Sequence, residues 1–416
     1  GTQFGMLIAL FDEVGQPGAE SAPDLDEVEA LYRQANARFA EDADFRDRAR
    51  RRVVDLQSGD RGANATWQRL VALSMAENQA VYDRLGVGDL MVRGESTYQP
   101  LLARVVADLE EAGLVVVDDG AKCVFVDGFT NAEGEALPLI VQKADGGYNY
   151  DTTDLAALRS RVEDGVGRLV YVVDAGQSQH FQMVFAVARM AGWLPEGVEA
   201  THVSFGLVLG EGGRRLRTRS GDNVRLVDLL DEAVERARRF VVARAEERGQ
   251  PIPDDVDDVA RVVGVGAVKY ADLSQHRQSN YVLSFDRMLS LKGNTAPYLQ
   301  YAYARIRSIL REAGWAQGDP GGAVPVTLAE PQELELAKRL VVTGDVVHRV
   351  AEEYLPNHLC THLFEVAQSY HQFYEHCPVL RSPEPLRSSR LALCHVTAAT
   401  LRLGLGLLGI EVLDRI

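Results

Sequence analysis

The chain has 416 residues, of which 46% are hydrophobic and 25% charged, and these proportions are typical of a globular protein with more than one domain. No apolar run is long enough for a transmembrane helix, so the sequence predicts no membrane span. The formal net charge of −16 argues mildly against a nucleic-acid-binding protein, although acidic stretches such as 24–32 and 251–260 can face away from a bound ligand.

The first part of the chain has a helical pattern that changes to a strand pattern near Leu114. Apolar residues recur at three- and four-residue spacing from about Pro23 to Leu85, with many charges between them, which predicts amphipathic surface helices. Two apolar runs around Asp118-Asp119-Gly120 then predict a β-hairpin. The segment 137–143 is expected to form the next strand.

The middle of the chain alternates between helix and strand patterns. A helix is expected over 151–165, with Asp151 or Thr152 as its cap. The continuously apolar run 168–174 is typical of a buried parallel strand, and a helix over 180–193 and a second strand over 201–210 follow it. This order predicts a βαβ unit and therefore a doubly wound α/β sheet.

After Arg225 the strand patterns stop. A long helix is predicted over 224–249, then a linker with two prolines at 251–258. The remainder, to Ile416, is almost wholly helical by its pattern. The expected architecture is therefore an α/β domain with a helical insertion, followed by an α-helical domain.

Several polar side chains lie where open α/β sheets bind ligands. Tyr150 and Asp154 are four residues apart and share one helix face, and a carboxylate with an aromatic ring suits a guanidinium. The simpler alternative is that Asp154 caps the helix and Tyr150 packs on the sheet. Gln177 and His180 follow the predicted strand at its carboxyl end, and each is either a ligand contact or an ordinary loop residue.

A glycine-flanked loop at 211–221 carries four arginines, at 214, 215, 217 and 219. Clustered guanidinium groups repel each other unless an anion lies among them, which favours phosphate binding over a merely solvated loop. The four cysteines are far apart, and His358 and His362 near Cys360 match no standard zinc spacing. The sequence therefore predicts buried thiols in a reducing cytosol and no protein-bound metal.

Long strings of this sequence resemble the arginyl-tRNA synthetases, which are class I synthetases. They include 143–158, 171–193, 202–230 and 263–310, and the resemblance extends over essentially the whole chain. It implies an arginine–tRNA ligase that activates L-arginine with ATP, accompanied by Mg²⁺, and transfers it to arginine tRNA. A cytoplasmic monomer is the expected state.

The resemblance also implies roles for particular residues. Tyr150 and Asp154 would hold the arginine side chain, and Gln177 would complete that pocket. The catalytic loop would use three arginines at the position of the family's K-M-S-K-like signature, where lysine is more usual: Arg215, Arg217 and Arg219. ATP would be bound by His202, Phe205, Gly206 and Ser220.

The resemblance implies three domains. Residues 1–225 would form the remainder of the class I catalytic domain, a partial Rossmann-like parallel sheet with a helical insertion at about 20–110. Residues 226–285 would form a helical linker that contacts the tRNA stem, and 286–416 an all-α anticodon-binding bundle. Candidate tRNA contacts, which could instead be helix packing, are Tyr298, Gln300, Tyr301, Tyr303 and Arg305.

The family's N-terminal domain and H-I-G-H-like signature are expected before the point where this sequence starts. Activity would then need that N-terminal portion. The alternative is a non-catalytic tRNA-binding paralogue or a subunit of a larger assembly.

Overall fold

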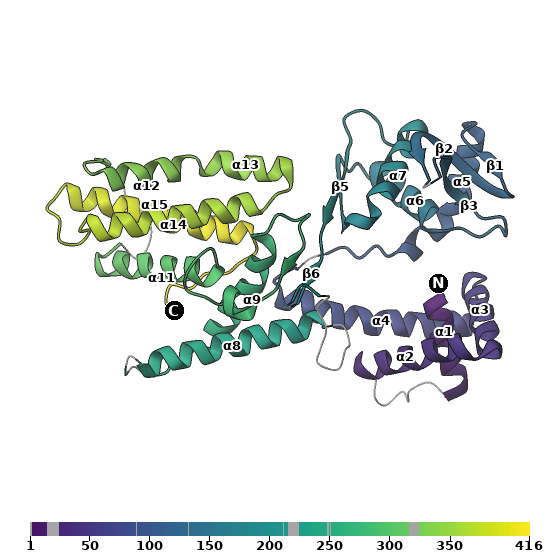
Figure 1. Cartoon of the computed structure of the whole chain (residues 1–416), viewed down its shortest axis with the longest axis horizontal. Coiled ribbons are helices and arrows are strands. Elements are labelled where there is room, and N and C mark those ends of the chain that lie inside the picture. Colours follow the sequence, from purple (N-terminus) through teal and green to yellow (C-terminus); the bar gives the residue numbers. More distant parts are fainter. Residues whose placement is uncertain are drawn as a thin grey trace. The chain divides into compact units, whose positions relative to one another are not determined.

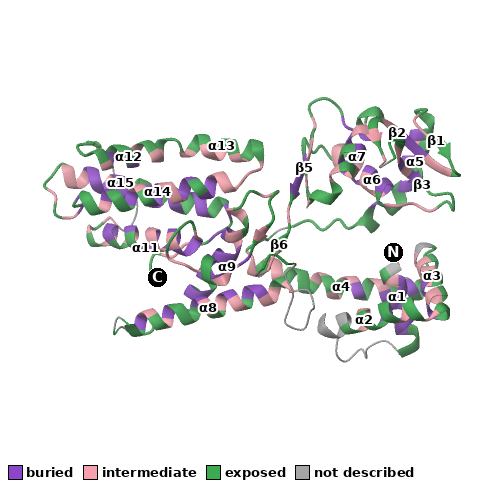
Figure 2. Ribbon diagram, in the orientation of Figure 1, coloured by how far each residue is buried: buried purple, intermediate pink, exposed green. Residues whose placement is uncertain are grey.

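The computed structural model describes residues 2–14, 25–88, 90–131, 133–210, 212–214, 224–247, 249, 251–315 and 324–416. The chain divides into two compact units, Gly1–Asp89 and Leu90–Ile416, and each is taken here by itself. Figure 1 labels their elements, and Figure 2 shows how far each residue is buried.

The first unit is helical, which confirms the prediction over the described residues from Leu25 onward. Its helices are α1 (Thr2–Val14), α2 (Leu25–Glu41), α3 (Ala43–Gln57) and α4 (Arg61–Arg84). Helices α1, α2 and α3 share a small core that includes Met6, Leu10 and Phe45, and Leu70 of α4 belongs to a second cluster with residues of α1. Helices α1 and α3 approach closely at Gly5, where a Cβ would lie 2.4 Å from the Ala49 carbonyl oxygen.

The second unit begins with η1 (Glu95–Leu101) and α5 (Leu102–Glu111), followed by β1 (Val116–Asp118), β2 (Ala121–Thr130) and β3 (Ala136–Gln142). These strands form an antiparallel sheet in chain order. The predicted hairpin is confirmed, and both residues of its turn, Asp119 and Gly120, have positive φ. Such a two-residue turn matches the twist of the strands that it joins.

A βαβ unit follows, as predicted. Helix α6 (Tyr150–Glu163) precedes β4 (Arg168–Asp174), η2 (Ala175–Gln177), α7 (Ser178–Met190) and β5 (Glu199–Phe205). Strands β4 and β5 are parallel and in register from Arg168↔Glu199 to Asp174↔Phe205. Because these two strands lie side by side, their carboxyl ends share one edge, where α7 begins.

Two details of this region differ from the prediction. Strand β4 is buried on one face only: Tyr171 and Val173 pack in the core with α7, whereas Val172 is 64% exposed. Helix α6 starts earlier than expected, with Asn149 as its N-cap and no side-chain capping bond. The expected caps at Asp151 and Thr152 are wrong because both side chains are buried.

The rest of the second unit is mainly helical. It contains α8 (Leu226–Glu247), α9 (Val256–Leu273), α10 (Phe285–Met288), α11 (Ala296–Glu312), α12 (Pro331–Val341), α13 (Thr343–Glu353), α14 (Asn357–His376) and α15 (Leu386–Leu407). The prediction that strands end at Arg225 misses β7 (Tyr281–Val282), which pairs with β6 (Val208–Leu209) in parallel. A two-residue strand is too short for a hydrophobic period to reveal it.

The C-terminal helices share one core, formed by residues such as Leu299, Ile306, Leu363, Val366 and Leu401. All four cysteines are buried and unpaired with one another. None of the described helices has the length and hydropathy needed to cross a bilayer.

One ion pair lies inside this helical core. Arg390 Nε donates to Glu333 Oε1 at 2.6 Å, and the two side chains are 5% and 0% exposed. The other carboxylate oxygen of Glu333 accepts from the backbone N–H groups of Ala329 and Glu330. Arg390 Nη1 also donates to the Pro378 carbonyl and to Ser382 Oγ, so both members of the pair have further hydrogen bonds within the protein.

Candidate functional site

A cluster of two carboxylates and one imidazole lies between the start of α6 and the first turn of α7. His180 Nε2 is 2.7 Å from Asp154 Oδ2, and His180 Nδ1 is 3.0 Å from Asp151 Oδ1. The side chains of His180 and Asp151 are 11% exposed, whereas that of Asp154 is 30% exposed. Burial lowers the pKa of His180, but the hydrogen bonds to Asp151 and Asp154 outweigh it and raise the pKa to about 9.

The Tyr150 ring, which was expected beside Asp154, lies against this cluster. The Tyr150 ring contacts the His180 ring edge-on, with centroids 5.0 Å apart, and Tyr150 is otherwise exposed. Asp154 makes no capping bond to α6, so the capping alternative is wrong for this residue. Gln177 is exposed and is the residue that immediately precedes α7, one turn before His180. The structure thus brings Tyr150, Asp154 and Gln177 to the same end of the sheet.

The residues expected beside adenine lie along β5 and just after it. His202 Nε2 is 3.1 Å from the Val173 carbonyl oxygen, and its ring contacts Phe181 at a centroid distance of 5.1 Å. Phe205, the last residue of β5, is exposed. A Cβ on Gly206 would lie 2.8 Å from the Ser279 carbonyl carbon and oxygen, so no side chain fits there.

The segment after α9 fixes the end of β5. Arg277 Nη1 donates to the Ser204 carbonyl at 2.5 Å, and Gln278 Nε2 donates to Ser204 Oγ at 3.0 Å. Arg277 Nε also donates to the carbonyl of Tyr354, at the end of α13. The Tyr354 hydroxyl donates to Glu199, at the start of β5. One arginine therefore joins the strand that carries His202 to the helical part of this unit.

Four residues expected in the phosphate-binding loop fall outside the described residues: Arg215, Arg217, Arg219 and Ser220. Arg214 is the last described residue before this gap, and its carbonyl accepts from Gly210 N–H at 2.8 Å.

The candidate tRNA contacts on α11 separate into inward and outward side chains. Gln300 is fully buried, and its Nε2 donates to the carbonyls of Val262 and Glu411. Tyr303 is also buried and donates to Asp414. These two positions agree with the helix-packing alternative.

The outward side chains include two cation–ring contacts. Arg305 is exposed and lies over the Tyr374 ring, with its guanidinium carbon 4.5 Å from the ring centroid. Tyr301 is half-buried beneath Arg244. Tyr298 lines a cavity of about 590 Å³ between α11, α12 and α14, with Gln332, Gln368 and Gln372 among its walls.

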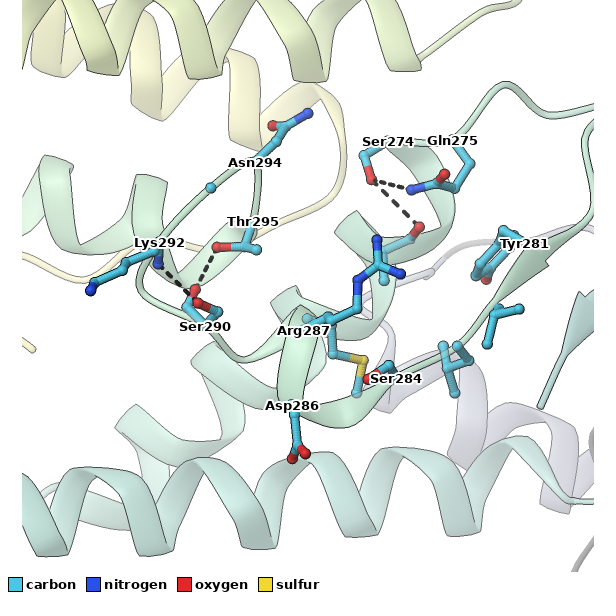
Figure 3. Close-up of a pocket in the computed structure, with 15 residues that line it drawn as sticks. Ser274, Gln275, Tyr281, Ser284, Asp286, Arg287, Ser290, Lys292, Asn294 and Thr295 are labelled. Atoms are coloured by element: carbon cyan, nitrogen blue, oxygen red, sulfur yellow. Dashed lines mark hydrogen bonds between the residues drawn. The ribbon is translucent and has the colours of Figure 1, made fainter. Parts of the chain in front are cut away.

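A second cavity, of about 500 Å³, is lined by residues of α9, β7, α10 and the loop before α11. Figure 3 shows Arg287 directed towards the Ser274 loop and Asp286 directed the other way. Asp286 accepts a hydrogen bond from Arg236 of α8 at 3.3 Å. Arg287 thus places a positive group among the hydroxyl and amide groups of this cavity, whereas the Lys292 side chain is directed away from them in Figure 3.

Comparison with known proteins shows the family of this chain. The family model for the catalytic domain of class I tRNA synthetases (R) matches residues 1–285, and that for the DALR anticodon binding domain matches residues 299–416. The arginine–tRNA ligase of Synechococcus elongatus is 56% identical over the whole chain, which spans 71% of that relative. This chain belongs to the arginyl-tRNA synthetase family. The ligase from Cyanothece is 54% identical, and the chain spans 72% of it.

Solved structures of the family have the same fold. An arginyl-tRNA synthetase from Plasmodium falciparum superposes with a TM-score of 0.83 at 31% identity, and the match covers all of this chain and 68% of that one. The Thermus thermophilus enzyme superposes with a TM-score of 0.81 at 25% identity, covering 74% of its chain. The predicted fold class, a class I α/β domain followed by a helical anticodon domain, is confirmed.

Sequence reasoning did not predict the contacts that join Asp151, His180 and Asp154. Asp151 was expected only as a helix cap, and His180 only as a possible contact. The available signal was the three-residue spacing of Asp151 and Asp154, which places both acids on one helix face near a histidine that opens the next helix. In the described residues, no group of three or more His, Cys, Asp or Glu side chains is arranged to hold a metal ion.

Proposed function

We propose that this chain is an arginine–tRNA ligase in which Asp154 holds the arginine guanidinium beneath the Tyr150 ring. The observation that supports this most directly is a partly exposed carboxylate beside an aromatic ring, at the carboxyl end of β4 and β5. Arginine's planar fork of N–H donors suits that carboxylate, and the ring face attracts the cation. Gln177 completes the pocket from the start of α7.

The remaining substrate groups are assigned along the same edge. We propose that His202, Phe205 and Gly206 line the adenine end of ATP, and that Ser220 and the arginines of the 215–219 loop meet its phosphates. The Gly206 backbone suits this role because it passes close to the neighbouring segment without a side chain. Mg²⁺ would accompany ATP as a substrate ion, and the chain itself would hold no metal.

For tRNA, we propose three α11 residues that are not fully buried as contacts: Tyr298, Tyr301 and Arg305. Exposed aromatic and guanidinium faces stack on unpaired bases, and a cation–ring pair such as Arg305 and Tyr374 offers such a surface. We further propose the domain limits 1–225, 226–285 and 286–416, with a cytoplasmic monomer as the working state. Gln300 and Tyr303 would support α11 from inside.

The test is arginine-dependent ATP–pyrophosphate exchange with arginine tRNA present. It would be run on the chain alone and on the chain joined to the part of a relative that lies outside the match. Asp154→Ala removes one partner of a charge pair, so arginine binding should weaken by about 3–5 kcal/mol. The matched control is Asp127→Ala, which removes an exposed acid on β2.

Unchanged exchange in Asp154→Ala would remove the assigned role of that residue. Binding of tRNA without exchange in either form of the chain would instead favour a non-catalytic tRNA-binding protein.

A further inference from the structure

The two acids beside His180 are bonded differently. Both oxygens of Asp151 are engaged inside the protein: Oδ1 meets His180 Nδ1, and Oδ2 accepts from Asn149 Nδ2 at 2.8 Å. Asp154 uses only Oδ2, towards His180 Nε2, and within the described residues its Oδ1 accepts no hydrogen bond. Asp151 therefore holds the imidazole, and Asp154 presents a carboxylate oxygen outward.

The charge of the cluster follows from this arrangement. Two carboxylates flanking an imidazole at both ring nitrogens favour the protonated ring, because each nitrogen then donates to one acid. The cluster then carries one net negative charge. A single monovalent cation beside Asp154 would make the cluster neutral, whereas a second cation would give it a net positive charge.

We propose that His180 is a positioning residue, anchored by Asp151, which fixes the outward carboxylate of Asp154 and limits the pocket to one guanidinium-type cation. This inference rests on the proposed arginine site and extends it to two residues that touch the substrate only through Asp154. A rigid carboxylate loses less entropy on binding than a free one, so it binds the planar guanidinium fork more tightly. It also discriminates by orientation, since a fixed carboxylate accepts two parallel N–H bonds in one plane.

The other titratable groups around the imidazole include tyrosines, Arg161 and His202. Within the described residues, Arg161 forms no ion pair with Asp151 or Asp154. Tyr150 lies against the ring from α6, and Tyr171 of β4 lies near Asp154. Arg161 of α6 donates to the Tyr171 hydroxyl at 3.2 Å, and burial raises the pKa of that tyrosine. His202 is separated from His180 by the Phe181 ring, which contacts both.

The first test measures arginine binding to the full chain by calorimetry in His180→Gln, which keeps a polar side chain but removes the charge. Arginine affinity should fall roughly tenfold to a hundredfold, because losing the charge-assisted hydrogen bond that fixes Asp154 outweighs the extra negative charge left beside the ligand. The matched control is His371→Gln, at an exposed histidine of α14, which should bind arginine as the wild type does. Thermal unfolding of each variant establishes that it is folded.

The second test uses Asp151→Asn, which keeps the shape of that side chain. With His180 protonated the cluster is then neutral, so arginine should bind weakly at low pH. Losing one carboxylate partner lowers the pKa of His180, so its proton leaves as the pH rises, the net negative charge returns, and arginine binding strengthens. The wild type should show no such rise between about pH 6 and pH 8, where His180 stays charged.

A structural role alone would weaken binding in Asp151→Asn equally at every pH. That result, or equal arginine affinity in His180→Gln and His371→Gln, overturns the inference while the arginine site stands. A wild-type chain that binds no arginine overturns the arginine site itself and this inference with it.

Discussion

Two acid–cation clusters in the second unit are built from similar groups and differ in what surrounds them. In the helical core, Glu333 and Arg390 are 0% and 5% exposed, and each makes further hydrogen bonds to backbone groups. At the edge of the parallel sheet, Asp154 is 30% exposed and offers an unused oxygen. The first cluster is closed, and the second is open to a ligand.

The comparison shows how a structural ion pair differs from a binding site. In a closed pair each charge is neutralised by its partner inside the core. Removing one partner leaves a lone buried charge and should lower the free energy of unfolding. An open cluster keeps a carboxylate available, and its cation is a histidine that can lose its proton in an accessible pH range. Three predictions would break or sharpen this distinction.

The largest effect is expected when the closed pair is broken. Arg390→Met leaves Glu333 buried without its partner, and the free energy of unfolding should fall by about 3–5 kcal/mol. Urea unfolding of the full chain, followed by circular dichroism, measures this. A loss below about 1 kcal/mol would show that Glu333 is held adequately by its backbone donors.

The open cluster around His180 should instead make the free energy of unfolding depend on pH. The pKa of His180 rises from 6.5 to about 9 on folding, so its stabilising contribution is fully present below about pH 6.5 and is lost as the pH rises through 9. The loss should be on the order of 3 kcal/mol. Comparing the unfolding free energy of wild type and His180→Gln across this range isolates it, and parallel curves would contradict the assignment.

The smallest effect is expected at a surface pair of the same charge types. Arg349 and Glu353 lie one turn apart on α13, at 3.1 Å, and both are exposed. Arg349→Met should change the free energy of unfolding by about 0.5 kcal/mol or less. A change as large as that of Arg390→Met would mean that burial does not govern the difference between the clusters.

Local patterns predicted much of the fold. The hairpin turn and the alternation of strand and helix over 168–210 depend on nearby residues, and both are present in the structure. The spacing of Tyr150 and Asp154 alone favours ordinary roles, and only the family resemblance points to them as site residues. In the structure both contact His180.

Where prediction failed, a distant contact outweighed a local preference. Asp151 and Thr152 are good capping residues by type, but Asp151 bonds to His180 of α7 and Thr152 to the Val141 carbonyl of β3. The sequence leaves Gln300 open between a tRNA contact and helix packing, and its amide bonds to carbonyls of Val262 and Glu411 inside the unit. Neither partner is near in sequence, so no window of neighbouring residues reveals it.

The close passage at Gly206 has a consequence for variation at this position. Its hydrogen is packed against the Ser279–Asn280 peptide, where even a methyl group would collide with backbone atoms. Backbone atoms cannot move away as the end of a flexible side chain can. Any other amino acid would therefore displace the end of β5 from the loop that follows α9. Only glycine therefore fits at this position, and an alanine side chain would force the two segments apart.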